Sequence, residues 1–180
     1  MKNWMIIMLC LFTYLPISLA QVGVDNSKDV DLSFLEGNWQ GEWIVYDTDI
    51  NGYELNVVTY SNLLIHQKGE AFQTTHKYYD QHGIGAPKTG SIQAHGAYLD
   101  FWGRTYIVKG LKRKKGNVSL AAVAVAHKDD PDKGKEWLYL ELQDGELQIK
   151  EVHEDKGQGE DGLQKSFVLT SLDEGGHWIE

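Results

Sequence analysis

Hydrophobic and polar residues alternate with a period of two in the stretch that follows Gly37. One face of this stretch carries Trp39, Gly41, Trp43 and Val45, and the other carries Gln40, Glu42, Ile44 and Tyr46. Such alternation is typical of a β-strand with one buried face. We therefore expect a strand whose first set of residues lies inside the protein. Just before it, Asp31 and Ser33 are placed to cap a single helical or 3₁₀ turn.

Further strand-like segments follow, separated by short turns. They cover residues 54–66, 71–79, 91–95, 97–109, 118–127, 137–143, 146–154 and 164–172. Asn51-Gly52 and Asp144-Gly145 favour two-residue hairpin loops, because both central residues of a type I′ turn need positive φ. No segment shows the periodicity of a long amphipathic helix. The pattern predicts an all-β protein, a single antiparallel up-and-down β-barrel of 8–10 strands over residues 31–173.

The Asp144-Gly145 turn also predicts which residues share a face. A two-residue loop would pair Leu142 with Leu147, Leu140 with Ile149, Leu138 with Glu151, and Glu136 with His153. This face is apolar near the turn and becomes polar farther away. We expect the apolar part to form a side wall of the barrel interior, and the polar part to lie near one rim.

The first 20 residues have the composition of a secretory signal peptide. Lys2 precedes an apolar run over residues 5–15, and a small-x-small cleavage site ends at Ala20. Residues 21–30 are polar and aperiodic, as in a flexible leader, and residues 174–180 form a short tail. The protein is thus predicted to be exported, to the periplasm or the exterior. Its single cysteine, Cys10, lies in the signal peptide, so packing and sheet hydrogen bonds must stabilise the mature chain without disulfides.

The chain is acidic. Its net charge is -9, and removal of Lys2 with the signal peptide makes it -10. Such a surface repels phosphate backbones, so nucleic acid is not expected as a partner. A basic run stands out against this background, Lys112, Arg113, Lys114 and Lys115, and we interpret it as a turn. It is a candidate for weak contact with an anionic membrane surface, although a solvated turn carries such charges without any partner.

The segment Phe34-Leu35-Glu36-Gly37-Asn38-Trp39-Gln40-Gly41 resembles the opening of the calycin superfamily. Lipocalins carry a Gly-x-Trp motif here, and fatty-acid-binding and nitrobindin-like barrels begin with a similar Leu-x-Gly-x-Trp element. The resemblance implies a small antiparallel barrel. Lipocalins usually place an arginine late in the last strand to pack over the tryptophan, whereas the last strand here offers only Lys165. Nitrobindin-like proteins bind haem through a histidine near the C-terminus. His177 lies in the tail and has no clear counterpart, so no cofactor is predicted.

The leading hypothesis is that the barrel binds a small, largely apolar ligand non-covalently. Aromatic residues gather on the first strand and on a later one: Trp39, Trp43, Tyr98, Phe101, Trp102 and Tyr106. We expect Trp39 and Trp43 to form the wall of the closed end and Phe101 to join the lining. The side wall is assigned to Leu138, Leu140 and Ile149, and the polar rim contacts to Glu151 and His153. The alternative is that the rings fill the core of a solid barrel that acts as an interaction module.

The sequence also contains candidates for a proton-transfer site and for a metal site. Glu151 and His153 share a strand face and could transfer protons in a cofactor-independent isomerase or lyase, but no nucleophile or oxyanion donor accompanies them, so the sequence favours a binder. The seven histidines lack metal-ligand spacing. The loop from Asp47 to Gly52 matches the first half of a calcium loop, but its twelfth position is Val58, where a bidentate glutamate is expected. We therefore predict no metal and leave calcium open at this loop.

Overall fold

The computed structural model describes residues 30–48, 54–80, 83–127, 129, 134–154 and 163–172. The predicted signal peptide, the tail and most of the candidate calcium loop lie outside these residues, as does the leader except for its last residue. The elements are η1 (Ser33–Leu35), β1 (Gly37–Thr48), β2 (Glu54–Lys68), β3 (Ala71–Asp80), β4 (Gly83–Ile84), β5 (Lys88–His95), β6 (Tyr98–Phe101), β7 (Arg104–Lys114), β8 (Asn117–Ala124), β9 (Glu136–Gln143), β10 (Glu146–His153) and β11 (Leu163–Ser171).

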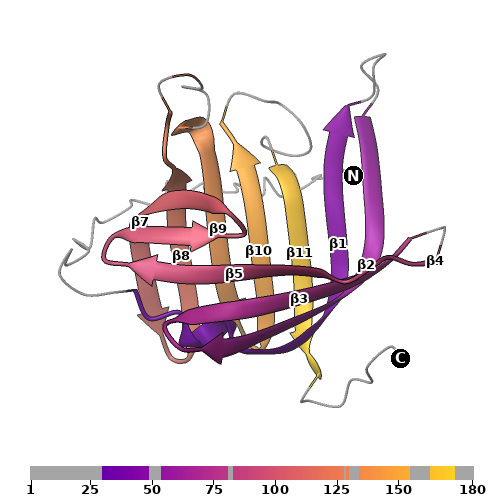
Figure 1. Cartoon of the computed structure of the whole chain (residues 1–180), viewed down its shortest axis with the longest axis horizontal. Helices are drawn as coiled ribbons and strands as arrows, with labels where there is room; N and C mark the ends of the chain where they lie inside the picture. The colour runs from indigo at the N-terminus through magenta and orange to yellow at the C-terminus, as the bar shows by residue number, and fades with distance from the viewer. Residues whose placement is uncertain are drawn as a thin grey trace, which may run out of the picture.

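The strands form one antiparallel sheet that closes on itself. The order β2-β1-β11-β10-β9-β8-β7-β6-β5-β3 is completed by the pairing of β2 with β3, and the two-residue β4 pairs with the end of β3. This is a closed barrel of ten strands with up-and-down connectivity, which confirms the predicted fold class. In Figure 1, β3 and β5 cross in front of β8 to β11, so the front and rear walls run in very different directions.

The β9–β10 hairpin has the register that the sequence predicts. Leu142 pairs with Leu147, Leu140 with Ile149, Leu138 with Glu151, and Glu136 with His153. Both residues of the turn have positive φ, 51° at Asp144 and 86° at Gly145. Four apolar residues of this hairpin are at most 1% exposed, namely Leu138, Leu140, Leu147 and Ile149. Burying each of them contributes about 1.5–3 kcal/mol relative to exposure to water, so this hairpin is a main part of the core.

The chain turns at Trp102-Gly103, within the segment that the sequence presented as one strand over residues 97–109. That prediction was wrong, since the segment is divided between β6 and β7. Trp102 has φ of 48° and Gly103 has φ of 81°. A tryptophan with positive φ is unfavourable by about 1–2 kcal/mol, so local propensity gave no sign of this turn. Tertiary contacts compensate, among them a hydrogen bond from the main-chain N–H of Trp102 to the carbonyl of Ser91 at 3.0 Å.

A 3₁₀ turn closes one end of the barrel, as predicted. The carboxylate of Asp31 accepts a hydrogen bond from the main-chain N–H of Ser33 at 2.9 Å, and Trp39 Nε1 donates to the carbonyl of Leu35 at 2.9 Å. Arg113 lies 5.7 Å from the ring of Phe34 and donates to the Asp31 carboxylate at 2.9 Å. The arginine at this end thus comes from β7, not from the last strand. In Figure 1 this turn is the indigo coil at the lower end of the barrel.

Val30 is the first residue that the structure describes, and it is packed in the core. Val30, which the sequence placed in the flexible leader, is 7% exposed and belongs to the hydrophobic core. It packs with Leu32, Phe34 and Leu35 at the closed end. The segment before β1 therefore covers the end of the barrel with apolar side chains, and the interior is packed tightly there.

Candidate functional site

A cavity lies in the half of the barrel away from η1. It has a volume of about 450 Å³, is partly open to solvent, and is bordered by β1, β3, β5, β11 and the β6–β7 turn. Its lining residues are Trp43, Thr74, His76, Lys88, Thr89, Gly90, Ser91, Trp102, Gly103, Lys165 and Phe167. This volume and the predominance of apolar surface suit a small organic molecule.

Aromatic rings form one wall of this cavity. Trp43 stacks on Phe167 with 5.6 Å between the ring centroids and 6° between the planes. Trp102 meets the same Phe167 ring edge-on, at 5.4 Å and 69°. Trp43 and Trp102 are only partly buried, whereas Phe167 is 2% exposed. The two indoles therefore supply the aromatic surface that a bound molecule would touch, and Phe167 fixes their relative position.

The position of Trp102 depends on two residues of the neighbouring strands. Its Nε1 donates a hydrogen bond to Oγ1 of Thr74 at 3.1 Å. Gly90 leaves the space for the indole, because a Cβ atom at that position would lie 2.8 Å from Cδ1 of Trp102. The side chain of Trp102 in the β6–β7 turn therefore packs against β3 and β5, and these contacts place it in the cavity wall.

His76 and Lys88 add polar groups to the aromatic wall. His76 is 6% exposed, its Nε2 lies 3.0 Å from Oγ of Ser61, and its ring meets Trp43 edge-on at 5.0 Å. Burial, helped by the charge of Lys88, lowers the pKa of His76 to about 4. Nζ of Lys88 lies 5.6 Å from the centroid of Trp43 and 5.0 Å from that of Tyr78. At neutral pH the wall therefore contains a neutral imidazole beside an ammonium group.

The low pKa of His76 predicts that the fold loses stability in acid. The unfolded chain binds a proton at this residue near pH 6.5, whereas the folded protein does so only near pH 4. Stability is therefore lost as the pH falls from about 6.5 towards 4. We expect a His76→Gln variant to lack about 2 kcal/mol of the decrease in unfolding free energy that the wild type shows between pH 7 and pH 5. Urea denaturation at several pH values measures this difference.

A matched control for this experiment is His95→Gln. The side chain of His95 is 54% exposed, so it loses little of its hydration on folding. The stability of His95→Gln should therefore depend on pH in the same way as that of the wild type. Equal slopes for the wild type and His76→Gln would show that His76 does not contribute to the acid sensitivity.

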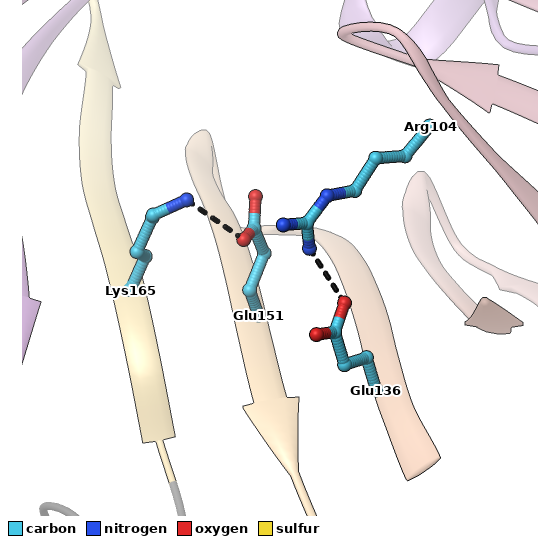
Figure 2. A network of polar contacts seen from close by, with 4 residues as sticks. All are labelled: Arg104, Glu136, Glu151 and Lys165. Carbon is cyan, nitrogen blue, oxygen red and sulfur yellow. Dashed lines mark hydrogen bonds and ion pairs between the residues drawn. The ribbon is translucent and has the colours of Figure 1, made fainter. Parts of the chain in front are cut away.

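A second polar group lies beside the cavity, where four charged side chains from four strands meet (Figure 2). Nζ of Lys165 lies 3.1 Å from the carboxylate of Glu151, and Nη1 of Arg104 lies 2.6 Å from that of Glu136. Figure 2 shows the guanidinium group of Arg104 between the two carboxylates. Lys165 also lines the cavity, so this network forms the polar border of the aromatic site.

The network also perturbs the groups around it. Tyr106 is 1% exposed, and burial together with the nearby charge of Glu151 raises its pKa to about 12. Burial is the largest single effect on Arg104 and disfavours its charge, but Glu136, Tyr106 and Glu151 together outweigh it, so the pKa of the guanidinium group is raised. Tyr106 thus stays a neutral hydroxyl at physiological pH. In the network itself, the negative charges of the two carboxylates balance the positive charges of Arg104 and Lys165.

The structure divides the predicted site residues between the packed half and the cavity half. Trp39 is 5% exposed and belongs to the closed end, as expected. Trp43 was expected to form the same wall, but it lies four residues farther along β1 and lines the cavity. Phe101 is buried with its ring centroid 4.5 Å from that of Trp102. The predicted side wall is fully buried core, and its members are Leu138, Leu140 and Ile149.

The two predicted rim residues lie next to each other on the inner face of β10. Glu151 has only 15% of its side chain exposed and pairs with Lys165, and His153 is 4% exposed. The carboxylate of Glu151 is therefore engaged with a cation, while a proton-transfer role for this pair stays a prediction. Tyr98, grouped with the interior aromatic residues in the sequence, is 50% exposed and faces outward.

Several cavity residues were not anticipated. His76 comes from a strand that the sequence left without functional assignment, and Lys88 begins β5 where the sequence predicted a loop before residue 91. Phe167 comes from the last strand, and Lys165 was considered only for its place in the lipocalin pattern. Trp102 was part of the aromatic cluster, but a continuous strand would have placed it on the face opposite Phe101. An available signal was the alternation of Phe72, Thr74, His76 and Tyr78 in β3, which places a histidine on an inward face.

The basic run is mostly strand rather than turn. β7 continues to Lys114, so the turn itself is Lys115-Gly116, and Arg113 points to the closed end where it binds Asp31. Lys112 and Lys114 border a shallow surface hollow of about 210 Å³ that also includes Glu141. This places an acidic residue next to the two lysines. Contact with an anionic membrane remains a prediction.

Two further observations concern metals and membranes. Within the described residues, no three His, Cys, Asp or Glu side chains are grouped closely enough to hold a metal ion. In the same part of the chain, no helix has the length and apolar character needed to span a membrane.

The fold and the cavity together define the class of the protein, a closed antiparallel β-barrel with a partly open, ligand-sized cavity at one end. This architecture is compatible with the calycin-like fold that the opening motif resembles. Comparison with protein-family models and with the curated proteins gave no match.

Proposed function

We propose that the protein binds a small, largely apolar molecule non-covalently in the half of the barrel away from η1. The observation that carries this proposal is the cavity of about 450 Å³ with the indoles of Trp43 and Trp102 in its wall. Apolar molecules gain free energy by leaving water for such a surface, and flat rings gain additional contact with the indoles. The opposite half of the barrel is packed, so the proposal assigns stability to one end and binding to the other.

The setting of this activity is part of the same proposal. The features of residues 1–20 support export, and the opening motif supports membership of the calycin superfamily. An exported barrel of this kind would take up its ligand outside the cytoplasm. Binding there requires no cofactor and no chemical step.

Replacement of Trp43 by alanine tests the proposed site. The neutral fluorescent probe N-phenyl-1-naphthylamine should bind the wild type saturably, and Trp43→Ala should weaken this binding at least about tenfold, because a large aromatic contact is lost. The loss of stability should be smaller than for a fully buried tryptophan, since Trp43 is only partly buried. Fluorescence titration and urea denaturation of the same preparations measure the two effects.

Trp137 provides the matched control. It is also a partly buried tryptophan, but it lies on the outer face of β9, stacked on Tyr139 with 6.1 Å between ring centroids. Trp137→Ala should leave the affinity for the probe unchanged. Equal affinities of wild type and Trp43→Ala, or an equal loss in both variants, would remove Trp43 from the site.

A further inference from the structure

The charged groups in the cavity wall all have the same sign. Of the described lining residues, Lys88 and Lys165 carry positive charge, and none is an aspartate or glutamate. The whole chain, by contrast, has a net charge of -9. The cavity is therefore a local cationic site on an acidic protein, which favours an anion inside it and disfavours a cation.

The two lysines differ in their partners. Lys165 forms an ion pair with Glu151 at 3.1 Å, so its charge is largely compensated. Within the described part of the chain, no carboxylate forms an ion pair with Lys88, and its ammonium group lies over the rings of Trp43 and Tyr78. His76, whose pKa the charge of Lys88 helps to lower, does not compensate it either, because this imidazole is neutral at physiological pH. Lys88 is thus the cation that a bound anion would meet.

The surroundings of Lys88 are aromatic. A molecule whose anionic group lies at this ammonium would have its remaining atoms against the indoles of Trp43 and Trp102, which keep part of their surface exposed to the cavity. Flat apolar groups make the largest contact with such rings. The geometry therefore combines one charge contact with one aromatic contact.

From this arrangement we infer that the ligand is a small planar or aromatic organic acid, with its carboxylate or an equivalent anionic group at Lys88 and its apolar body against Trp43 and Trp102. This inference rests on the proposed function and specifies the chemical class of its ligand. The anion distinguishes this class from the neutral apolar molecules that the aromatic wall alone would accept.

Two related fluorescent probes test the inference with the purified protein. They are 1-anilinonaphthalene-8-sulfonate, which carries an anionic group, and N-phenyl-1-naphthylamine, which has the same ring system without it. The wild type should bind the sulfonate more tightly. Lys88→Gln should weaken sulfonate binding about fivefold and change binding of the neutral probe less than about twofold, because one partly exposed charge contact is lost. Lys88→Arg should restore sulfonate binding.

Lys112→Gln is the matched control, since it removes one positive charge from the outer surface of β7 and should leave both affinities unchanged. Unchanged sulfonate binding in Lys88→Gln, or an equal loss for both probes, would overturn the role of Lys88 while leaving a binding cavity in place. Tighter binding of the neutral probe by the wild type would also overturn it. If the wild type bound neither probe, the proposed function itself would be contradicted.

Discussion

Replacing Gly41 with alanine is expected to separate β1 from β11 and to lower the free energy of unfolding by at least about 3 kcal/mol. A Cβ atom at Gly41 would lie 2.0 Å from the main-chain oxygen of Val168 and 3.1 Å from Cα of Leu169. These are backbone atoms of the paired strand, so no side-chain rotation can relieve the overlap. Relief requires movement of a strand at the junction that joins the first and last strands of the barrel.

Gly110→Ala is the control for this substitution. Gly110 also lies in a barrel strand, at the irregularity where β7 changes register against β8, but no atom lies within 4 Å of a Cβ placed there. Its unfolding free energy should stay within about 1 kcal/mol of the wild type. Urea denaturation followed by tryptophan fluorescence measures both variants. Similar stabilities for Gly41→Ala and Gly110→Ala would show that β1 and β11 are not in close approach at this point.

Replacing Trp39 with alanine is expected to lower the unfolding free energy by about 4 kcal/mol. The indole is 5% exposed, belongs to the core, and donates its Nε1 hydrogen to the carbonyl of Leu35. Its removal leaves a cavity under η1 and a carbonyl without its partner. The packing of η1 against the barrel end should be weakened as well. Chemical denaturation measures the loss of unfolding free energy.

Trp39→Phe separates the two parts of this effect. Phenylalanine retains most of the buried apolar surface but cannot donate to Leu35, so a loss of about 1–2 kcal/mol is expected. Binding of N-phenyl-1-naphthylamine should be retained by Trp39→Phe, because Trp39 is not among the described residues of the cavity wall. A loss in Trp39→Ala no larger than that in Trp39→Phe would mean that the indole ring fills no essential volume at the closed end.

The parts of the fold that depend on local chemistry could be predicted from the sequence. The β9–β10 register follows from a single Asp-Gly turn, because the length of the loop determines every pair beyond it. The 3₁₀ turn before β1 follows Asp31, whose carboxylate accepts a hydrogen bond from the main-chain N–H of Ser33, the first residue of the turn. The turn at Trp102-Gly103 was missed, since positive φ at a tryptophan is maintained by contacts with distant residues and leaves no local sign.

The candidate site was less accessible to prediction for the same reason. The face of β10 with Leu147 and Ile149 was recognised, but which part of an inner face is packed and which borders a cavity depends on the opposite wall of the barrel. His76 and Lys88 approach Trp43 because β3 and β5 cross the front of the barrel, as Figure 1 shows. Nothing in the separation of these residues along the chain indicates that crossing.

The pairing of β1 with β11 also has a consequence for how the chain folds during synthesis. Gln40 pairs with Thr170, 130 positions later, and a side-chain hydrogen bond links the same two residues. Contacts between such distant residues form slowly, because a long loop must first be ordered. A ribosome delivers β1 long before β11, so one edge of β1 stays unpaired beside Trp39 and Trp43 until β11 has been synthesised. That edge is where association with other nascent chains is most expected, and where a chaperone would act.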